Sequence, residues 1–456
     1  MNKQNFQLKE KDSILLTIKR LGINGEGIGF YKRQVVFVNN ALPGEIVEVK
    51  IVEANDKYVK GEITKFKKKS NDRIEAKCPY FGKCGGCQLQ HLSYKAQLRE
   101  KKNIVVEAFD RYFDGSTSKI NFLDTIGMEN PWEYRNKSSL PTRHDGEKVV
   151  VGMYAINSNK LVYINDCPIE NEKINETRKM ILSVLNKEKV DIFNPKDHTG
   201  SLRYLIIRAF PNTDDVQVCF VLTKEDKKLI SVLKKLPVKS ANYSINSDLK
   251  SVNIFGDEVV NVSGEKMING KLGNLNFQIS PQAFFQLNTL QTVKLYDKIK
   301  EACHLTGKEK VLDCYCGIGS IGMYLADKAL EVRGIDTNGE GIENARNFAL
   351  INKVNNAKFY KGDILPHLHQ FEKAGFIPDV LVVDPPRKGL ELNIINYLQS
   401  SKIKRIVYVS CNPSTLAKNI NHLQKNYYIK SVQPMDMFPQ TSNVETVVEL
   451  CLKERK

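Results

Sequence analysis

A cysteine near the end of the chain directly follows a predicted strand, a position at which a nucleophile could reach a bound ligand. The apolar run at residues 405–409 predicts a strand, and it stops abruptly at Ser410-Cys411-Asn412-Pro413. In open α/β sheets, ligands collect beyond the carboxyl ends of the parallel strands, so this thiol is expected at a ligand-binding edge. Nearby helix dipoles and basic residues can lower the pKa of such a thiol. The pattern therefore predicts a catalytic role for Cys411 rather than a buried core thiol.

A glycine-rich turn upstream predicts a site for a nucleotide-like cofactor. Residues 311–320, Val-Leu-Asp-Cys-Tyr-Cys-Gly-Ile-Gly-Ser, have the pattern of a strand, a tight turn and the start of a helix. Gly317, Gly319 and Gly322 complete a G-x-G-x-x-G spacing, in which the backbone approaches a ligand at the helix N-terminus. This motif alone leaves NAD open. The two cysteines within the turn are expected to be small residues that pack near the cofactor.

Acidic residues follow several of the predicted strands and narrow the choice of cofactor. Asp336 ends the second strand, at the distance expected of a carboxylate that binds ribose hydroxyls. Asp313 lies in the first strand, and Asp384-Pro385-Pro386 ends the fourth. The glycine turn and Asp336 suit NAD and S-adenosylmethionine alike. Asp313 and the Asp-Pro-Pro turn favour S-adenosylmethionine and a methyltransferase.

A cysteine and a carboxylate close to the C-terminus together suit methyl transfer to C5 of a pyrimidine. C5 of a pyrimidine is not nucleophilic in the resting base, but attack of a thiolate on C6 turns C5 into an enolate-like carbon that takes a methyl group. The C5 proton must then leave, which requires a base. Glu445, in Thr441-Ser442-Asn443-Val444-Glu445, is the candidate for that base, and Cys411 is the candidate nucleophile.

A second group of cysteines has the spacing of metal ligands. Cys78, Cys84 and Cys87 form C-x5-C-x2-C, and two glycines between the last pair allow a tight fold. The fourth ligand would be His91, which gives a zinc centre of three cysteines and one histidine, or Cys167. Four cysteines would suit zinc or a [4Fe–4S] cluster. The spacing alone leaves the metal open.

The elements that must position these residues fall into three blocks, and together they predict an α/β protein. Residues 1–68 contain short predicted strands at 14–18, 35–38, 46–51 and 59–66, with glycine-rich turns at 22–29 and Pro43-Gly44, which is typical of an OB-like barrel. Residues 69–275 carry the cysteine segment, a helix predicted over 93–113, and paired strands at 203–210 and 216–223, as in an α+β domain. Residues 276–456 alternate strand and helix, the pattern of a parallel, doubly wound, Rossmann-like domain. We expect helix 93–113 to dock on this last domain.

The charge of the chain favours a polyanionic partner. Its formal net charge is +16 and its pI is near 9.2, which suits nucleic acid. A basic run, Lys65, Lys67, Lys68 and Lys69, closes the first block. We find no apolar run of membrane-spanning length, and the N-terminus lacks the apolar core of a signal peptide, so we expect a cytoplasmic protein without membrane contact.

At this point the residues resemble the RNA (uracil-5-)-methyltransferase family over nearly the whole chain. The barrel block resembles a TRAM domain, and its presence with the cysteine segment points to the 23S rRNA branch, because members of the bacterial tRNA branch usually lack both. The motifs that carry the resemblance are Cys78-Pro-Tyr-Phe-Gly-Lys-Cys-Gly-Gly-Cys-Gln-Leu-Gln-His91, Ser280-Pro-Gln-Ala-Phe-Phe-Gln-Leu-Asn288, Asp313-Cys-Tyr-Cys-Gly317, Asp384-Pro-Pro-Arg-Lys-Gly389, Ser410-Cys-Asn-Pro413 and Phe438-Pro-Gln-Thr441.

The resemblance implies cofactors and residue roles. It implies a [4Fe–4S] cluster on Cys78, Cys84, Cys87 and Cys167, and S-adenosylmethionine as the methyl donor. It makes Cys411 the nucleophile and Glu445 the base, acting on RNA as a monomer. The chain departs from the family at Asn443, where a histidine often stands two residues before the glutamate. The residues implied around the methyl donor and target base are Gln286, Tyr315, Asp336 and Asp384.

Three other functions compete with uridine methylation of 23S rRNA. One is uridine-C5 methylation of tRNA. Another is RNA cytosine-C5 methylation, whose enzymes typically carry Asp-x-Pro-Cys at the fourth strand, where this chain has Arg387 in place of the cysteine. The third is a non-catalytic RNA-binding module, against which Cys411, Glu445 and the glycine turn argue.

Overall fold

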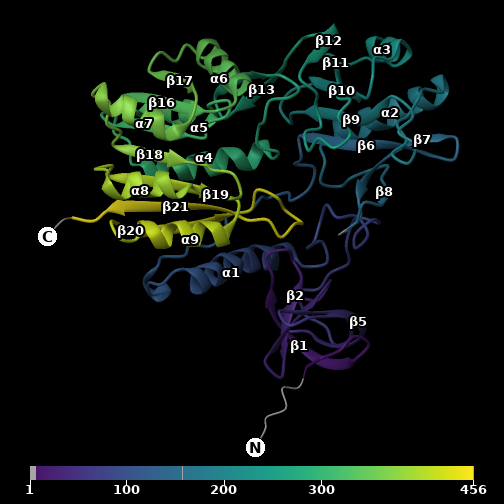
Figure 1. Cartoon of the computed structure of the whole chain (residues 1–456), viewed down its shortest axis with the longest axis horizontal. Helices are drawn as coiled ribbons and strands as arrows, with labels where there is room; N and C mark the ends of the chain where they lie inside the picture. The colour runs from purple at the N-terminus through teal and green to yellow at the C-terminus, as the bar shows by residue number, and fades with distance from the viewer. Residues whose placement is uncertain (1–6, 157, 455–456) are drawn as a thin grey trace, which may run out of the picture.

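The computed structural model describes residues 7–156 and 158–454 and arranges them in a barrel, a central domain and a C-terminal sheet domain (Figure 1). The barrel lies at one end of the molecule, and the long helix α1 (Tyr94–Tyr112) runs between it and the C-terminal domain. Within the described ranges, no helix is both long and apolar enough to cross a membrane.

The N-terminal strands close into a five-stranded barrel in the order β1-β2-β3-β5-β4, as the sequence predicts for an OB-like fold. Residues 27–31 form a strand, although the glycines there predict a turn. A side chain at Gly29 would lie 2.7 Å from the Leu16 side chain, so glycine lets this strand approach its neighbour closely. The strands are β1 (Ser13–Leu21), β2 (Gly27–Tyr31), β3 (Gln34–Val38), β4 (Ile46–Ala54) and β5 (Val59–Lys68).

The central domain is a seven-stranded sheet in the order β12-β11-β10-β9-β6-β7-β8, with two helices packed on one face. The predicted paired strands are β9 and β10, and they pair antiparallel. The elements are β6 (Lys137–Asp145), β7 (Lys148–Tyr154), β8 (Leu161–Tyr163), α2 (Glu172–Glu188), β9 (Leu202–Ala209), β10 (Val216–Leu222), α3 (Lys227–Lys234), β11 (Ser240–Ile245) and β12 (Val259–Gly264), after the short η1 (Thr117–Lys119).

The C-terminal domain has a seven-stranded sheet in the order β17-β16-β15-β18-β19-β21-β20. Its first five strands pair in parallel, as the sequence predicts, but β21 lies antiparallel between β19 and β20. A parallel return from β20 needs a crossover of about a dozen residues, and the nine-residue connection 436–444 makes a hairpin instead. The strands are β15 (Lys310–Cys314), β16 (Glu331–Asp336), β17 (Ala357–Lys361), β18 (Val380–Val383), β19 (Arg405–Ser410), β20 (Tyr427–Met435) and β21 (Glu445–Leu452).

Helices cover both faces of this sheet, and two segments from earlier in the chain join its core. α1 buries Ile104, Val105 and Phe109 in the same cluster as α9. The hairpin of β13 (Ile268–Leu272) and β14 (Leu275–Ile279) packs into the other cluster, so this core begins before residue 276. The remaining helices are α4 (Thr289–Cys303), α5 (Ser320–Leu325), η2 (Ala326–Lys328), α6 (Gly339–Ile351), α7 (Ile364–Lys373), α8 (Leu392–Ser400) and α9 (Pro413–Leu423).

Candidate active site

The predicted nucleophile and the predicted base meet at the end of one strand ladder. β19 and β21 pair antiparallel up to Ser410 opposite Thr446. Cys411 follows Ser410 and Glu445 precedes Thr446, so both lie at the same end of this ladder, where the charge of Glu445 acts on the thiol. Cys411 is half-buried, and Glu445 is buried. A thiol and a carboxylate that are well separated in sequence are therefore neighbours in the fold.

Asp384 brings a second carboxylate to the same place. It follows β18, which pairs with β19, and burial raises the pKa of Asp384 to about 6. Burial and then the charge of Asp384 raise the pKa of Glu445 to about 8, while Arg387 and Lys101 oppose the shift. A carboxylate with a pKa near neutrality is suited to accept and release a proton.

The thiol of Cys411 does not have the lowered pKa that its place at a strand end suggests. Burial raises the pKa of Cys411 to about 11, and the charges of Glu445 and Asp384 add to the increase. Arg387 acts in the opposite direction. Burial, together with the two neighbouring carboxylates, outweighs the nearby positive charge, so the resting site holds a thiol rather than a thiolate.

Arg387 connects the Asp-Pro-Pro-Arg turn to the loop before β21 and to the start of α9. Its guanidinium donates to Oδ1 of Asn443 at 3.2 Å, in the loop that leads to Glu445. Its backbone carbonyl accepts from Nδ2 of Asn412 at 3.3 Å and from the Thr415 hydroxyl at 3.1 Å, at the start of α9. Asn443, at the position where the family often has histidine, thus accepts a hydrogen bond from Arg387, a cation whose charge opposes the raised pKa of Cys411.

A cleft of about 680 Å³ lies beyond the carboxyl ends of the parallel strands, where the sequence predicts the cofactor. Tyr315 and Asp336 line it, together with residues after β17 and β18. The Asp336 carboxylate accepts from the backbone N–H groups of Gly317 at 2.9 Å and of Asn338 at 2.8 Å. Gly317 has φ +55°, and a side chain there would point into open space. The turn therefore leaves room for a ligand beside a carboxylate.

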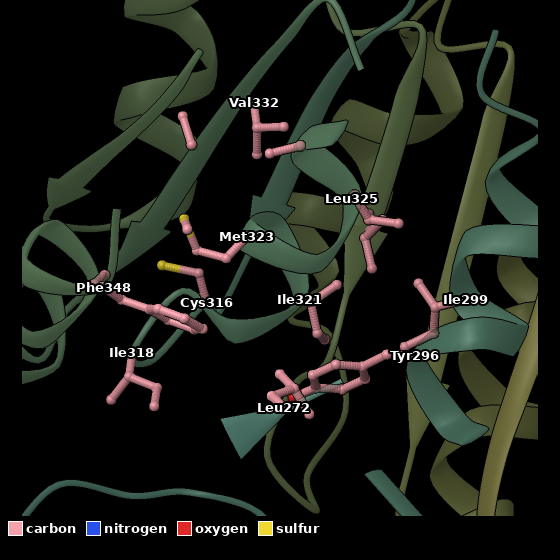
Figure 2. Close-up of a cluster of buried hydrophobic side chains, with 14 of the residues drawn as sticks. Leu272, Tyr296, Ile299, Cys316, Ile318, Ile321, Met323, Leu325, Val332 and Phe348 are labelled. Atoms are coloured by element: carbon pink, nitrogen blue, oxygen red, sulfur yellow. The ribbon is translucent and has the colours of Figure 1, made fainter. Parts of the chain in front are cut away.

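The other turn residues serve packing. A side chain at Gly319 would lie 2.5 Å from the Phe359 ring, so this glycine lets the turn sit against the sheet. Cys316 lies beside Ile318 and Phe348 in the buried core (Figure 2), which confirms its reading as a packing residue. Asp313 is fully buried, accepts from the Gly322 N–H at 2.8 Å, and has its pKa raised by burial to about 8.

Gln286 precedes α4 in the loop that connects the C-terminal domain to the central domain. Its backbone carbonyl accepts from Nδ2 of Asn136 at 2.9 Å, which anchors the loop before α4 to the central domain. Among the described residues, no hydrogen bond to its side chain is found. Its side chain is half-buried, so it remains available to a ligand.

The four predicted cluster cysteines line one small cavity of about 50 Å³. Apolar side chains such as Phe81 and Ile164 share the wall with Arg135 and Glu170. Burial raises the pKa of the thiols of Cys84, Cys87 and Cys167, that of Cys87 to about 12. In the part of the chain that the structure describes, no three His, Cys, Asp or Glu side chains are already set at metal-binding geometry.

His91, the alternative fourth ligand, is not part of this cavity lining. Its ring packs on Phe81 with the ring centroids 5.1 Å apart, and burial lowers its pKa to about 4. Neither ring nitrogen has a hydrogen-bond partner among the described residues. Cys167 is therefore the better placed of the two candidates.

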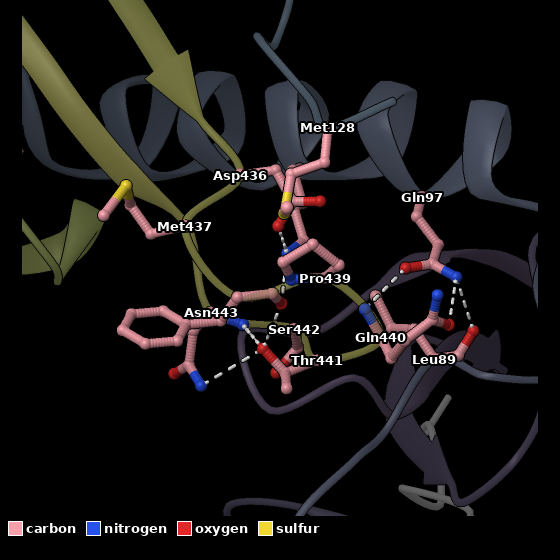
Figure 3. Close-up of polar contacts among 12 residues, drawn as sticks. Leu89, Gln97, Met128, Asp436, Met437, Pro439, Gln440, Thr441, Ser442 and Asn443 are labelled. Carbon is pink, nitrogen blue, oxygen red and sulfur yellow. Dashed lines mark hydrogen bonds and ion pairs between the residues drawn. The ribbon is translucent and has the colours of Figure 1, made fainter. Parts of the chain in front are cut away.

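Contacts that the sequence did not predict hold the loop 436–444, which we call the catalytic loop because Glu445 follows it (Figure 3). The Gln440 backbone carbonyl accepts from the N–H groups of Gln88 and Leu89, directly after Cys87, at 3.1 and 2.9 Å. Gln97 of α1 bonds both the backbone and the side chain of Gln440. Gln440 has φ +71°, which is uncommon for a residue with a side chain and is held by these contacts.

A buried ion pair fixes the other end of the catalytic loop. Lys101 of α1 pairs with Asp436, and both side chains are fully buried. The Lys101 ammonium also donates to the Phe438 carbonyl at 3.0 Å, and the Tyr94 hydroxyl donates to Asp436 at 2.9 Å. No local spacing in the sequence signals this network, because its two halves are more than 300 residues apart.

The comparisons with known proteins agree with this arrangement. Residues 93–453 match the model of the tRNA (uracil-5-)-methyltransferase family, and residues 8–64 match the TRAM domain. The chain is 45% identical to an uncharacterized RNA methyltransferase of Halalkalibacterium halodurans over 98% of each chain, and 42% identical to one of Listeria monocytogenes over 98% of this chain and 99% of that one.

A solved structure also matches the whole chain. It is the Pyrococcus abyssi tRNA (uracil-54, C5)-methyltransferase in complex with S-adenosyl-L-homocysteine, with a TM-score of 0.75, 28% identity, and coverage of 96% of this chain and 100% of that one. The chain therefore belongs to the tRNA (uracil-5-)-methyltransferase family and is an S-adenosylmethionine-dependent RNA methyltransferase with a TRAM domain.

Proposed function

We propose that this enzyme methylates C5 of a uridine in 23S ribosomal RNA through a covalent bond between Cys411 and C6 of the uracil. The observation that carries the proposal is the β19–β21 ladder, which brings the Cys411 thiol and Glu445 to one end, where Glu445 and Asp384 both act on the thiol. A nucleophile without a neighbouring base would leave the C5 proton in place. The geometry supplies both groups at one strand end.

The chain's own residues account for each proton in the reaction. Cys411 loses its proton to a neighbouring carboxylate, and its sulfur bonds to C6 of the uracil, which makes C5 nucleophilic. S-adenosylmethionine, when bound, supplies the electrophilic methyl group. After C5 is methylated, Glu445 removes the C5 proton, the C5–C6 double bond re-forms, and the Cys411 sulfur leaves. The pKa of Glu445, raised to about 8, keeps it basic enough for that step.

We assign the methyl donor to the cleft beyond β15 and β16. Asp336 would bind the ribose hydroxyls, Tyr315 would line the site, and Gly317 and Gly319 would let the backbone approach. The open space at Gly317 and the cleft volume support this assignment. Gln286 and Asp384 would stand between the donor and the target base.

We assign a [4Fe–4S] cluster to Cys78, Cys84, Cys87 and Cys167. Four thiols on one cavity fit the group, because iron would offset the burial that raises the pKa values of Cys84, Cys87 and Cys167. The reaction needs no electron, so we infer a structural role. The segment that carries Cys87 bonds the catalytic loop through Gln88 and Leu89, and an ordered cluster would fix that contact.

RNA would engage the barrel together with the central domain, with the enzyme acting as a cytoplasmic monomer. Strand β5 and the residues after it carry Lys65, Lys67, Lys68 and Lys69, which would displace counterions from phosphates. The target uridine must leave its stack before Cys411 can reach C6.

Transfer RNA is the second candidate substrate, because the solved Pyrococcus abyssi neighbour is a tRNA (uracil-54, C5)-methyltransferase. Mass mapping of 23S rRNA and tRNA from a strain that lacks the protein separates the two. We expect one or more 5-methyluridines to disappear from 23S rRNA and to return on addition of the purified enzyme. Loss confined to tRNA would identify the second candidate, and loss of a 5-methylcytidine would reject uridine as the target.

A further inference from the structure

Two cations of the central domain face each other across neighbouring strands. Lys137 of β6 and Arg208 of β9 are direct partners in the strand ladder, and Arg208 is only 2% exposed. Like charges placed directly opposite each other destabilise a sheet, as does a charge removed from water. The Lys137 ammonium donates to the backbone carbonyl of Pro281, at 3.3 Å. This contact lies outside the central sheet, in a loop of the C-terminal domain, so the pair acts on the boundary between the two domains.

Arg208 holds the same loop, residues 280–288, which runs from β14 to α4 and carries Gln286. Its guanidinium donates to the backbone carbonyl of Ser280 at 3.2 Å and to that of Ala283 at 2.7 Å. The planar guanidinium presents its N–H groups in a fixed fork, so one side chain sets the positions of two carbonyls. The central domain therefore fixes the first half of this loop.

The side chain of Ser280 extends the contact to the C-terminal sheet domain. Its hydroxyl donates to Oε1 of Glu340, which lies in the first turn of α6. Burial lowers the pKa of Arg208 to about 10, and the charge of Glu340 opposes that shift, so the carboxylate is close enough to act on the guanidinium. Ser280 is thus bonded to Arg208 through its carbonyl and to Glu340 through its hydroxyl.

The first turn of α6 packs on the glycine turn of the cofactor cleft. A side chain at Gly341 would lie 3.1 Å from the carbonyl oxygen of Gly317. Asn338, the N-cap of α6, accepts from the Gly341 N–H at 3.0 Å and donates its own N–H to Asp336 at 2.8 Å. Asp336 also accepts from the Gly317 N–H. The position of the first turn of α6 therefore sets both the glycine turn and the carboxylate beside it.

We propose that Arg208 is a positioning residue for the methyl donor, which acts through Ser280 and Glu340 on the turn at Gly317. A residue of the central domain thereby contributes to the affinity for S-adenosylmethionine. The proposal rests on the proposed cofactor cleft and adds to it a connection that begins in another domain. It also explains why a buried cation stands opposite Lys137, because the loop carbonyls require a donor at that point.

The test is the Kd of S-adenosylmethionine for the full-length protein, measured by calorimetry. Arg208→Met should raise this Kd about tenfold, a size typical of coupling between two sites. Arg208→Lys, which keeps the charge without the fork, should restore part of the affinity. Ser280→Ala removes only the hydroxyl bond to Glu340 and should give a similar loss, so it tests the same connection even if Arg208→Met does not fold. At saturating S-adenosylmethionine, adduct formation between Cys411 and 5-fluorouridine RNA should proceed at the wild-type rate in both variants.

Arg203→Met is the matched control. Arg203 is a buried arginine of the same strand, and it donates to the carbonyls of Asn246 and Asp248, outside the loop 280–288. This variant should lower the melting temperature as Arg208→Met does, but it should leave the Kd unchanged. The double variant Arg208→Met/Ser280→Ala should bind the donor about as well as either single variant, because both changes interrupt one connection.

A wild-type Kd in Ser280→Ala or in folded Arg208→Met, an equal loss in Arg203→Met, or additive losses in the double variant would overturn the proposal. Asp336→Ala tests the cleft itself. If Asp336→Ala binds the donor normally, the cleft assignment fails and the proposal fails with it. If Asp336→Ala weakens binding while Ser280→Ala does not, the cleft stands and the role of Arg208 alone is rejected.

Discussion

The side-chain nitrogen of Gln97 donates to Oε1 of Gln440 at 2.9 Å, while the Gln97 oxygen accepts from the Gln440 N–H at 3.0 Å. Gln97 belongs to the helix that follows the cysteine segment, and Gln440 belongs to the loop that ends at Glu445. This pair, with Lys101 and Asp436 beside it, makes the position of the base depend on a helix from another part of the chain.

Gln97→Ala should therefore slow methylation without weakening cofactor binding. Loss of the pair leaves a buried N–H of Gln440 without a partner, which costs about 1–3 kcal/mol and loosens the loop. We expect kcat to fall by roughly tenfold with the S-adenosylmethionine Kd unchanged by calorimetry. Gln399→Ala, which removes a comparable bond to the His422 carbonyl on the exposed side of α8, is the control. A normal kcat for Gln97→Ala would show that the contact between α1 and the catalytic loop does not contribute to catalysis.

The raised pKa of Cys411 predicts a rate of adduct formation that increases with pH. At neutral pH the thiolate is the minor form, because the pKa is about 11. Arg387→Gln removes the cation that opposes this shift, so its adduct should form more slowly at about pH 7 and recover as the pH rises toward 10. Stopped-time gel assays with 5-fluorouridine RNA give the rate. A pH-independent defect would mean that Arg387 acts by holding Asn443 rather than by its charge.

Glu445 should reduce stability at alkaline pH. Its folded-state pKa, about 8, lies above its unfolded value, so its contribution is favourable when it is protonated and is lost as the pH rises through the folded pKa. Glu445→Gln should have a melting temperature close to that of the wild type at about pH 5 and roughly 3 °C higher at about pH 9. Equal melting temperatures at both pH values would show that the carboxylate is not desolvated.

The cysteine cavity predicts a cluster that depends on Cys167 and not on His91. Protein purified without oxygen should be brown, Cys167→Ser should lose the colour and iron, and His91→Leu should keep both. Elemental analysis for iron, sulfide and zinc is the measurement. A colourless wild-type protein with stoichiometric zinc would replace the iron–sulfur assignment with a zinc site. Loss of the metal in His91→Leu but not in Cys167→Ser would move the fourth ligand to His91.

Removal of the barrel is a poor test of RNA binding, because the barrel is part of the folded core. Leu21 and Leu42 pack with Leu89, Leu92 and Ala96, next to the cysteine segment. Truncation would expose this cluster and disturb the catalytic loop as well. Changes at Lys67 and Lys68 to glutamine are the cleaner probe, and each should reduce the salt dependence of RNA binding by about one counterion.

The sequence predicted which residues lie at the ends of the strands in the C-terminal sheet. The sequence placed Cys411, Asp336 and Asp384 at strand ends, as the structure does, because each follows an apolar run. The sequence did not predict the antiparallel insertion of β21, since an apolar run carries no direction. The strand Gly27–Tyr31 was missed because its glycines serve close packing rather than a turn.

Contacts between distant segments were beyond reach of the sequence for a different reason. Gln97, Lys101 and Gln440 have ordinary spacing, and their roles arise only when α1 docks beneath the sheet. The raised pKa of Cys411 likewise depends on burial and on two carboxylates that the fold brings together from different strands.

The covalent mechanism is tested most directly by an RNA adduct on a denaturing gel. With 5-fluorouridine RNA and S-adenosylmethionine, the wild type should form a stable adduct, because no C5 proton is available for removal. With unmodified RNA, Glu445→Gln should accumulate a methylated adduct, since bond formation at C6 and methyl transfer precede proton removal. Cys411→Ala should form no adduct with either RNA. An adduct on Cys411→Ala, or normal turnover by Glu445→Gln, would contradict the account.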